Sequence, residues 1–488
     1  MVCQWRAFFI AVTVWGLSQY GKVKRYQERD RKTAQRKQDP FIEIIEAQES
    51  EFNAVLDEMK SHTGRRDALY GQPWYLLLGE QGSGKSQFIQ RSGLSFLFST
   101  VLNASKTQEK KTFDWWVGNE AVIIDPDGAL ITQDSHPYPE REIRQWRHFI
   151  DWLEQTRRHR PLNGVVVTID VIKLIERDEA SRLAYAAQIR SRLKELMETI
   201  ASRLPIYVVL TKWDSLNGFE PFFRHCNAAE RASILGFTYS LHSLESIDEW
   251  LTEFSQDYDR LIAQLNALLI DYEIGRSGAE RQAMFSFVKQ VSGLKHGLQT
   301  MLETMFLRDK FSTPGLLRGT YFTSVEQQGV PHDIFDDAIA RRYQLTAPSR
   351  SAQQAKQSLV YFASTLFENA IIPEAGLATD NIKVLKQKRR LILYATMTCC
   401  LATILLLVGW QHSYGENRQR AENVLTKVRL YQSTEQDKPH SPQAMLASLE
   451  QIRSAMLAYG FFMKRRSTFL KWDCTKGTLL ALKWKRRI

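Results

Sequence analysis

The most constraining feature of this sequence is a glycine-rich stretch that follows a short apolar segment. Residues 79–86 read Gly-Glu-Gln-Gly-Ser-Gly-Lys-Ser, the pattern G-x-x-x-x-G-K-S of a phosphate-binding loop, or P-loop. The apolar residues 73–78 before it have the length of a strand, and residues 87–98 after it have a helical pattern. This is the context that a P-loop requires, and it disfavours the alternative of an ordinary glycine-rich turn.

The residue types in this stretch suit the phosphates of a nucleotide. Gly79, Gly82 and Gly84 would let backbone N–H groups turn toward phosphate oxygens at the start of a helix. Lys85 would reach the β- and γ-phosphates, and the Ser86 hydroxyl would ligate Mg²⁺. We therefore expect ATP or GTP with Mg²⁺ as the ligand.

Two downstream motifs fit the same site. Residues 121–125 form a strand-like run that ends in Asp125, and Asp125 to Gly128 read D-x-x-G, so Asp125 would hold Mg²⁺ and the Gly128 amide would approach the γ-phosphate. After a second strand-like run, Thr211, Lys212 and Asp214 match the [N/T]-K-x-D pattern of GTPase-like proteins. In that pattern the carboxylate accepts from the purine edge and the lysine stem packs over the base; an ordinary charged turn is the alternative.

The order of these segments predicts a fold class. Strand-like runs at 73–78, 121–125, 164–170 and 206–210 alternate with helical patterns, including a long one near 180–200. This predicts an α/β fold, a P-loop NTPase-like, doubly wound, mostly parallel sheet with all three motifs at the carboxyl ends of its strands. Residues 250–307 have apolar residues at helical spacing and predict an added helical region, a candidate surface for a cytoplasmic partner.

The residue that would orient water for hydrolysis is not identified. Ala129 follows the D-x-x-G where small GTPases often carry glutamine, so slow ATPase or GTPase activity, or activation by a partner, is expected. The aromatic pairs at 115–116 and 222–223 are interpreted as core or interface packing rather than a base-stacking platform. The five cysteines show no metal-ligand spacing.

The charge distribution argues against nucleic acid as a partner. Residues 22–37, 383–390 and 461–488 carry +6, +5 and +8, so the rest of the chain, whose total is +11, carries −8. Two of these basic blocks flank apolar segments, which is typical of the cytoplasmic side of a membrane. Membrane lipid is therefore a more natural partner than DNA or RNA.

Two segments are candidates for the membrane. Residues 391–410 form a run of 20 residues without a charge, long enough to span a bilayer as a helix; a buried core helix is the alternative. The basic residues before it place the preceding chain in the cytoplasm and the following chain outside. Residues 7–17 are also apolar, and the basic run that follows favours a partial anchor over a signal peptide.

We expect the following domain organisation: an anchor helix at 1–20, a basic linker and helix at 21–70, the P-loop domain at 71–240, its helical extension at 241–390, the membrane helix at 391–410 and a short periplasmic tail at 411–488.

Many short motifs resemble one known family. Residues 73–86 (PWYLLLGEQGSGKS), 113–125 (FDWWVGNEAVIID), 204–214 (LPIYVVLTKWD), 316–324 (LLRGTYFTS) and 371–378 (IIPEAGLA) resemble the IcmF/TssM family of type VI secretion systems. The resemblance extends in order over roughly residues 7–415. It implies a protein of the bacterial inner membrane whose bulk is cytoplasmic, with a DotU/TssL-type membrane protein and a TssJ-type outer-membrane lipoprotein as partners.

Several positions depart from that family. Pro126 and Asp127 replace the usual Thr-Ala, and the Asp127 carboxylate would repel phosphate unless it points away or joins Mg²⁺. Only the second helix of the expected membrane hairpin is recognisable, and almost all of the large periplasmic part, with its TssJ-type contacts, is missing. After about residue 462 the sequence changes character, and we interpret the tail as a frameshift product; a genuine basic periplasmic tail is the alternative.

Three functional hypotheses follow. The first is a membrane-anchored P-loop NTPase subunit of type VI secretion. The second is a structural scaffold, or truncated remnant, with a vestigial site that does not hydrolyse nucleotide. The third, a small-GTPase-like switch, depends on residues 211–214 and requires a preference for guanine.

Overall fold

The computed structural model describes residues 41–63, 69–99, 112–133, 139–241, 247–272, 275–306, 315–329, 331–335, 342–343, 353–354, 359–435 and 442–461. The anchor expected at residues 7–17 and the tail after residue 461 lie outside these ranges. The chain divides into two compact units, residues 1–386 and 387–488, and each is described by itself.

The first unit is a mixed α/β domain, as the alternation of segments predicts. Its main sheet consists of β1 (Trp74–Leu78), β2 (Phe96–Ser99), β3 (Phe113–Gly118), β4 (Val122–Pro126), β5 (Gly164–Asp170), β6 (Pro205–Thr211), β7 (Gly236–Thr238) and β8 (Leu316–Phe322), and a separate pair is formed by β9 (Gln328–Gly329) and β10 (Gln353–Gln354). Its helices are α2 (Ile42–Thr63), α3 (Lys85–Gln90), α5 (Gly128–Thr132), α6 (Pro139–Thr156), α7 (Val171–Glu176), α8 (Glu179–Ile200), α9 (Phe219–Phe223), α10 (Ala228–Ala232), α11 (Ile247–Tyr272) and α12 (Gly278–Phe306), with short helical turns η2 (Trp213–Ser215), η4 (Phe367–Ile371) and η5 (Ala375–Leu377).

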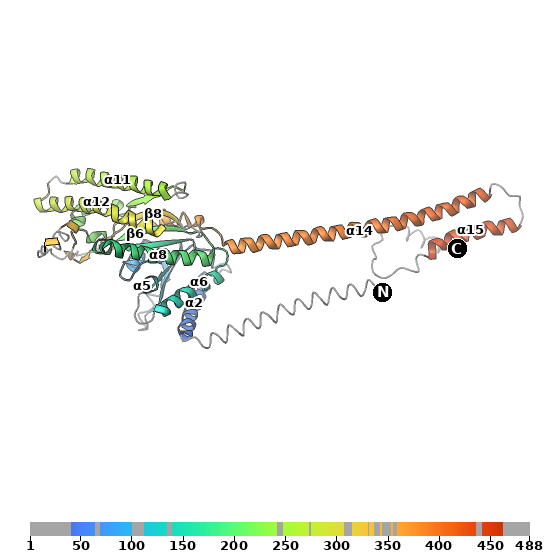
Figure 1. Ribbon diagram of the computed structural model, residues 1–488, viewed down its shortest axis with the longest axis horizontal. Coiled ribbons are helices and arrows are strands. Elements are labelled where there is room, and N and C mark those ends of the chain that lie inside the picture. The colour runs from blue at the N-terminus through green and yellow to red at the C-terminus, as the bar shows by residue number, and fades with distance from the viewer. Residues whose placement is uncertain are drawn as a thin grey trace. The chain divides into compact units, whose positions relative to one another are not determined.

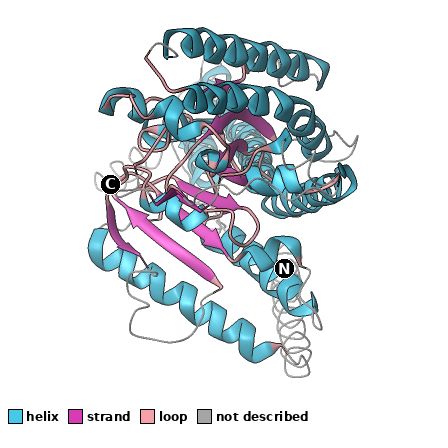
Figure 2. Cartoon of the chain, turned by 90° about the vertical axis from the view of Figure 1, so that its left-hand side faces the viewer, coloured by secondary structure: helices cyan, strands magenta, loops and turns pink. Residues whose placement is uncertain are grey.

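The main sheet has a parallel centre. In the described residues it has eight strands in the order β2-β3-β4-β1-β5-β6-β8-β7. The pairs β4–β1, β1–β5, β5–β6 and β6–β8 are parallel, whereas β2–β3, β3–β4 and β7–β8 are antiparallel. Figure 2 shows the strands between layers of helices. The carboxyl ends of the central parallel strands therefore meet at one edge.

Both faces of the sheet are buried, which explains its continuous apolar runs. Along β1, Trp74, Leu76 and Leu78 pack in one core cluster, while Tyr75 and Leu77 pack in another on the opposite face. On the first face α8 packs against α6 and α12, and α11 packs outside α12 (Figure 1). The aromatic pairs at 115–116 and 222–223 are buried in these cores, as interpreted from the sequence.

The structure corrects one expectation and adds strands that the sequence analysis did not predict. The helix expected at 87–98 ends at Gln90, because Gly93 has a left-handed φ of 79° and lies against the Ser364 carbonyl, and residues 96–99 then form β2. β3, β7 and β8 of the main sheet and the short pair β9 and β10 were not predicted as strands either. β8 lies within the region interpreted as a helical extension, in which α11 and α12 are the expected helices.

The second unit contains the apolar run. α14 (Ile382–Glu435) begins at the end of the first unit and includes residues 391–410, whose side chains are exposed throughout. Among the described helices, one passes the length and composition criteria for crossing a membrane, and it is this one. It is followed by α15 (Pro442–Phe461).

A candidate nucleotide site at the carboxyl edge of the sheet

The P-loop connects β1 to α3. Gly82 and Gly84 both have φ values of 78°, a left-handed conformation that glycine adopts without strain. Gly79 lies so close to β5 that an added Cβ would be 2.2 Å from the Thr168 hydroxyl oxygen. Each glycine of the motif is therefore required by backbone shape or by close packing, and the loop curves tightly at the start of α3.

Lys85 is held inside this loop. Its Nζ donates to the carbonyl oxygens of Gly79 at 2.9 Å and Pro126 at 2.6 Å, and it lies 3.2 Å from Asp125 Oδ1. The Lys85 side chain is only 8% exposed. The amine therefore joins the P-loop to the end of β4, inside the concave side of the loop.

The Asp125 carboxylate contacts both Lys85 and Ser86 of the P-loop. Its Oδ2 accepts from Ser86 Oγ at 2.9 Å, and the carboxyl is 4% exposed. Burial raises the pKa of Asp125 above its usual value, and the Lys85 charge and the Ser86 hydroxyl oppose that rise. The expected magnesium pair of Ser86 and Asp125 is thus in direct contact.

The D-x-x-G segment fits beneath the loop. Asp127 caps α5, because its Oδ1 accepts from the Ala129 N–H at 3.2 Å. Gly128 is packed against P-loop backbone, and an added Cβ there would lie 2.1 Å from the Gln81 nitrogen. The carboxylate that departs from the resembled family is therefore engaged at a helix start, and only glycine fits the next position.

The motif at the end of β6 is tied to the P-loop. Thr211 Oγ1 donates to the Ser83 carbonyl oxygen at 2.7 Å. Lys212 Nζ donates to the Gly82 carbonyl oxygen at 2.6 Å and to Asp170 Oδ2 at 2.6 Å. Lys212 also adopts a left-handed φ of 61°, which is uncommon for a residue other than glycine. These contacts join the end of β6 to the P-loop and to β5.

Asp214 is buried next to Ser324, a residue that the sequence analysis did not assign to the site. Its Oδ1 accepts from Ser324 Oγ at 2.7 Å, just after β8. Burial raises the pKa of Asp214 to about 6, against the smaller opposing effect of the Ser324 hydrogen bond. Ser324 lies 110 positions along the chain from Asp214, and β8 was not recognised as a strand, so this contact could not be predicted from sequence spacing.

A cavity of about 470 Å³ lies beside these residues. Gly84 and Gln87 of the P-loop region, Thr211 and Lys212 of the β6 motif, and Asp214 line it together with Asp170, Ile172, Lys173, Glu176, Ser215, Val325, Glu326 and His332. Small-molecule sites usually have volumes of about 300–1,000 Å³. The cavity is therefore large enough for part of a nucleotide.

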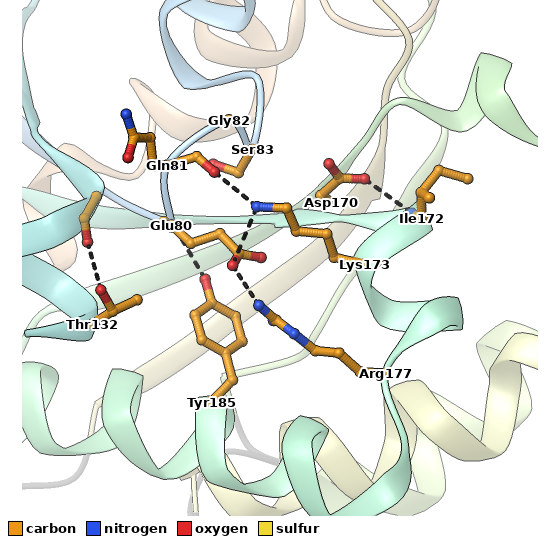
Figure 3. Close-up of polar contacts among 12 residues, drawn as sticks. Glu80, Gln81, Gly82, Ser83, Thr132, Asp170, Ile172, Lys173, Arg177 and Tyr185 are labelled. Atoms are coloured by element: carbon orange, nitrogen blue, oxygen red, sulfur yellow. Dashed lines mark hydrogen bonds and ion pairs between the residues drawn. The ribbon is translucent and has the colours of Figure 1, made fainter. Parts of the chain in front are cut away.

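Glu80 is the one carboxylate within the P-loop motif itself. Its Oε2 lies 2.5 Å from Arg177 Nη2 and 3.3 Å from Lys173 Nζ, and its backbone N–H donates to the Tyr185 hydroxyl oxygen at 3.2 Å (Figure 3). Lys173 also donates to the Gln81 carbonyl oxygen at 2.8 Å. Two cations thus pair with this carboxylate.

The buried Asp214 carboxylate leads to a prediction about stability. Because its folded pKa of about 6 exceeds the usual 3.8, ionised Asp214 destabilises the fold; the penalty is complete above pH 6 and fades as the pH falls toward 3.8. Asp214→Asn should therefore raise the free energy of unfolding at pH 8 by on the order of 2 kcal/mol. Denaturant unfolding at pH 8 and pH 4 would measure this. An equal gain at both pH values would contradict it.

All ten site residues expected from the sequence lie at this edge of the sheet: Gly79, Gly82, Gly84, Lys85, Ser86, Asp125, Gly128, Thr211, Lys212 and Asp214. The P-loop residues and Asp125 form one group, and the β6 motif forms a neighbouring group joined to it through Ser83 and Gly82. The geometry is that of an α/β domain with a phosphate-loop motif, followed by a helix of membrane-spanning length.

Comparison with known proteins identifies the family. Residues 139–400 match the family described as "IcmF-related N-terminal domain", so the chain belongs to the IcmF-related family. It is also 32% identical over 369 residues to a Pseudomonas aeruginosa protein described as "Type VI secretion system component TssM1". That alignment covers 75% of this chain and 33% of the relative, so the chain spans about a third of the relative's length.

A solved structure of an SsGBP mutation variant is only distantly similar. It has a TM-score of 0.20 and 14% sequence identity, and the match covers 37% of this chain and 54% of that chain. This likeness is too slight to support an argument about the fold.

Proposed function

We propose that this chain is a membrane-anchored component of a type VI secretion system whose P-loop NTPase-like unit binds a nucleoside triphosphate with Mg²⁺. The observation that carries the proposal is the convergence of Lys85 and Ser86 of the P-loop on Asp125 of β4, whose carboxylate oxygens lie 3.2 Å from Lys85 Nζ and 2.9 Å from Ser86 Oγ. Family membership and the relative's description support the secretion context.

The residues present fit a magnesium–nucleotide complex. Ser86 is exposed at the start of α3, and its hydroxyl and the Asp125 carboxylate would hold Mg²⁺, Asp125 usually through water. Lys85 would exchange its carbonyl partners for phosphate oxygens. The metal would supply charge neutralisation for the phosphates. No group in the described residues is assigned to orient water, so slow turnover remains the expectation.

A second candidate function is a structural scaffold. The observation that favours it is that the chain's own groups already satisfy Lys85, through the Gly79 and Pro126 carbonyls and Asp125. In a scaffold, the role of the motif would be to stabilise the fold through these contacts. The two functions differ in whether nucleotide changes the stability of the folded chain.

Thermal unfolding of the purified full chain in detergent separates the two. Saturating Mg²⁺-ATP or Mg²⁺-GTP should raise the unfolding midpoint, because a ligand at about 100 times its Kd stabilises the folded state by about 2.7 kcal/mol. Addition of EDTA should reverse the shift. An unchanged midpoint with both nucleotides would favour the scaffold.

The cations around Glu80 give a further prediction. Arg177→Gln should weaken binding of a triphosphate about 10-fold, because the Glu80 carboxylate would then be less neutralised near the phosphates. The double change Glu80→Gln with Arg177→Gln should recover most of the affinity. Equilibrium binding of a fluorescent nucleotide would measure both. Equal losses in the single and double variants would contradict the electrostatic explanation.

We place the first unit in the cytoplasm and α14 across the bacterial inner membrane. The exposed apolar residues 391–410 and the basic block at 383–390 before them support this orientation. A DotU/TssL-type protein, a TssJ-type lipoprotein and membrane lipid are the proposed partners, and nucleic acid is not. Protease digestion of spheroplasts should leave residues 41–382 protected; their cleavage from outside would reverse the orientation.

A further inference from the structure

The amino edge of the main sheet, opposite the nucleotide site, carries basic and apolar side chains around the start of α14. Building on the proposed membrane placement of α14, we propose that this edge is a docking surface for the anionic headgroups of the same membrane. The folded unit itself, and not only its helix, would then contact lipid. We refer to the following residues as the amino-edge surface: Tyr70, Arg158, Arg160, Arg203, Leu385 and Lys386.

Hydrogen bonds join the loops at this edge to the first turn of α14. The Tyr70 hydroxyl oxygen, before β1, accepts from the His159 N–H at 3.3 Å, and the His159 carbonyl oxygen, before β5, accepts from the Asn381 N–H at 2.9 Å. The Ala201 carbonyl oxygen, before β6, accepts from the Ile382 N–H at 2.9 Å. All of these residues belong to the first unit, so the surface is a continuous part of one folded body.

A buried arginine supports the surface from beneath. The Arg157 side chain is 2% exposed, and its guanidinium lies 4.5 Å from the ring centroid of Trp74 and 5.2 Å from that of Tyr70. Its Nη1 donates to the Pro161 carbonyl oxygen at 3.2 Å, and its Nη2 donates to the Gln72 carbonyl oxygen at 3.4 Å. These contacts fix the loop that carries the two arginines of the surface.

The charge of this edge is opposite to that of the rest of the body. Outside its three basic segments the chain carries −8. Five basic side chains gather here, those of Arg158, Arg160, Arg203, Lys383 and Lys386, against three acids, Asp151, Glu154 and Asp380. Two of the acids are engaged in ion pairs, since Asp380 pairs with Arg160 at 3.0 Å and Glu154 pairs with Lys383 at 2.9 Å. A net positive edge remains, which suits an anionic surface.

Exposed apolar side chains lie among these cations. Tyr70 is 43% exposed, Ile382 is 40% exposed and Leu385 is 50% exposed. Tyrosine is enriched where a protein meets the headgroup layer, because its ring is apolar and its hydroxyl is polar. Basic, aromatic and aliphatic side chains together are typical of surfaces that lie on an anionic bilayer.

The length of the chain keeps this edge close to the bilayer. Residues 382 and 391 are nine positions apart on α14, and residue 391 begins the apolar run. At about 1.5 Å per residue, this stretch spans at most about 14 Å, of which the headgroup layer takes about 5–8 Å. Charges interact over about 8 Å at physiological salt, so the start of α14 lies within reach of the headgroups. This proximity favours lipid over an acidic protein as the occupant.

Photo-crosslinking of the full chain tests the inference. The chain, with Tyr70→p-benzoylphenylalanine, is reconstituted into nanodiscs that contain equal parts of phosphatidylglycerol and phosphatidylcholine. Irradiation should attach phosphatidylglycerol at least about fivefold more than phosphatidylcholine, because a single Lys or Arg near an anionic surface strengthens binding by about that factor. The preference should fall in about 1 M salt, where the screening length is about 3 Å.

Matched variants define the surface. The same probe at Phe285, which is 53% exposed on α12, should attach little lipid, since α12 packs against α9 beyond the carboxyl end of β6. In the chain with the probe at Tyr70, the double change Arg158→Gln with Lys386→Gln should remove most of the preference for phosphatidylglycerol. Arg260→Gln, which removes a cation that is 71% exposed on α11, should leave it unchanged.

The outcomes separate this inference from the membrane placement on which it rests. Extraction of the unaltered chain from vesicles by alkaline carbonate would overturn both. Retention of the chain with equal attachment of the two lipids, or with no more attachment at Tyr70 than at Phe285, would overturn the docking surface alone. In native membranes, attachment of the Tyr70 probe to a protein instead of lipid would also overturn it.

Discussion

Replacing Lys85 with alanine should lower the affinity for a magnesium–nucleoside triphosphate by at least about 100-fold, because hydrogen bonds to charged phosphates contribute about 1.5–3 kcal/mol each. In the structure the Lys85 amine is buried between two P-loop and β4 carbonyls, and the phosphates would replace those partners. Equilibrium binding of a fluorescent nucleotide to the full chain measures the loss.

The matched control for this variant is Lys60→Ala. Lys60 is exposed on α2 and pairs with Asp57 three residues earlier, so its removal should leave the affinity unchanged. Because Lys85→Ala also leaves the buried Asp125 without its cation, circular dichroism must show that the variant is folded. Unaltered affinity in a folded Lys85→Ala chain would mean that the nucleotide, if bound, lies elsewhere.

Gly128→Ala should have the second large effect. A methyl group at this position would lie 2.1 Å from the Gln81 nitrogen and 2.5 Å from the Glu80 carbonyl carbon. Both are backbone atoms of the P-loop, so the loop itself must shift, at a cost of about 1–3 kcal/mol in stability. We expect the variant to lose nucleotide binding more than about 10-fold.

Gly376→Ala provides the control for Gly128→Ala. Gly376 has no heavy atom within 4 Å of the added Cβ, and its φ lies outside the left-handed region. Its replacement should change neither the unfolding midpoint nor nucleotide affinity. If Gly128→Ala bound nucleotide as well as Gly376→Ala does, the close packing of α5 against the P-loop would have no role in the site.

The sequence predicted the parts of the fold that are governed by local pattern. Four strands, β1, β4, β5 and β6, coincide with apolar runs bounded by turn residues, and α8, α11 and α12 coincide with helical periodicity. The helix after the P-loop was predicted too long, because a left-handed Gly93 against the Ser364 carbonyl depends on tertiary packing. β8 was missed, although it lies between β6 and β7 in the sheet.

The candidate site was predictable where its residues follow motif spacing. The direction in which each side chain points could not be predicted from that spacing. From its position alone, the Asp127 carboxylate was expected to repel phosphate unless it points away or joins Mg²⁺. In the structure it accepts a hydrogen bond from the Ala129 N–H and caps α5. Ser324, Lys173 and Arg177 belong to none of the three nucleotide-site motifs. They reach the site only because β8, α7 and the residue after α7 fold beside the P-loop and β6. Their roles come from three-dimensional contacts rather than from sequence spacing.

The most direct test of the central claim is calorimetric titration of the full chain in detergent with Mg²⁺-GTP. The account predicts saturable binding of one nucleotide per chain, lost when EDTA removes Mg²⁺ and lost in Lys85→Ala. The absence of saturable binding to a folded chain, with GTP and ATP alike, would contradict it and leave the P-loop as a structural element.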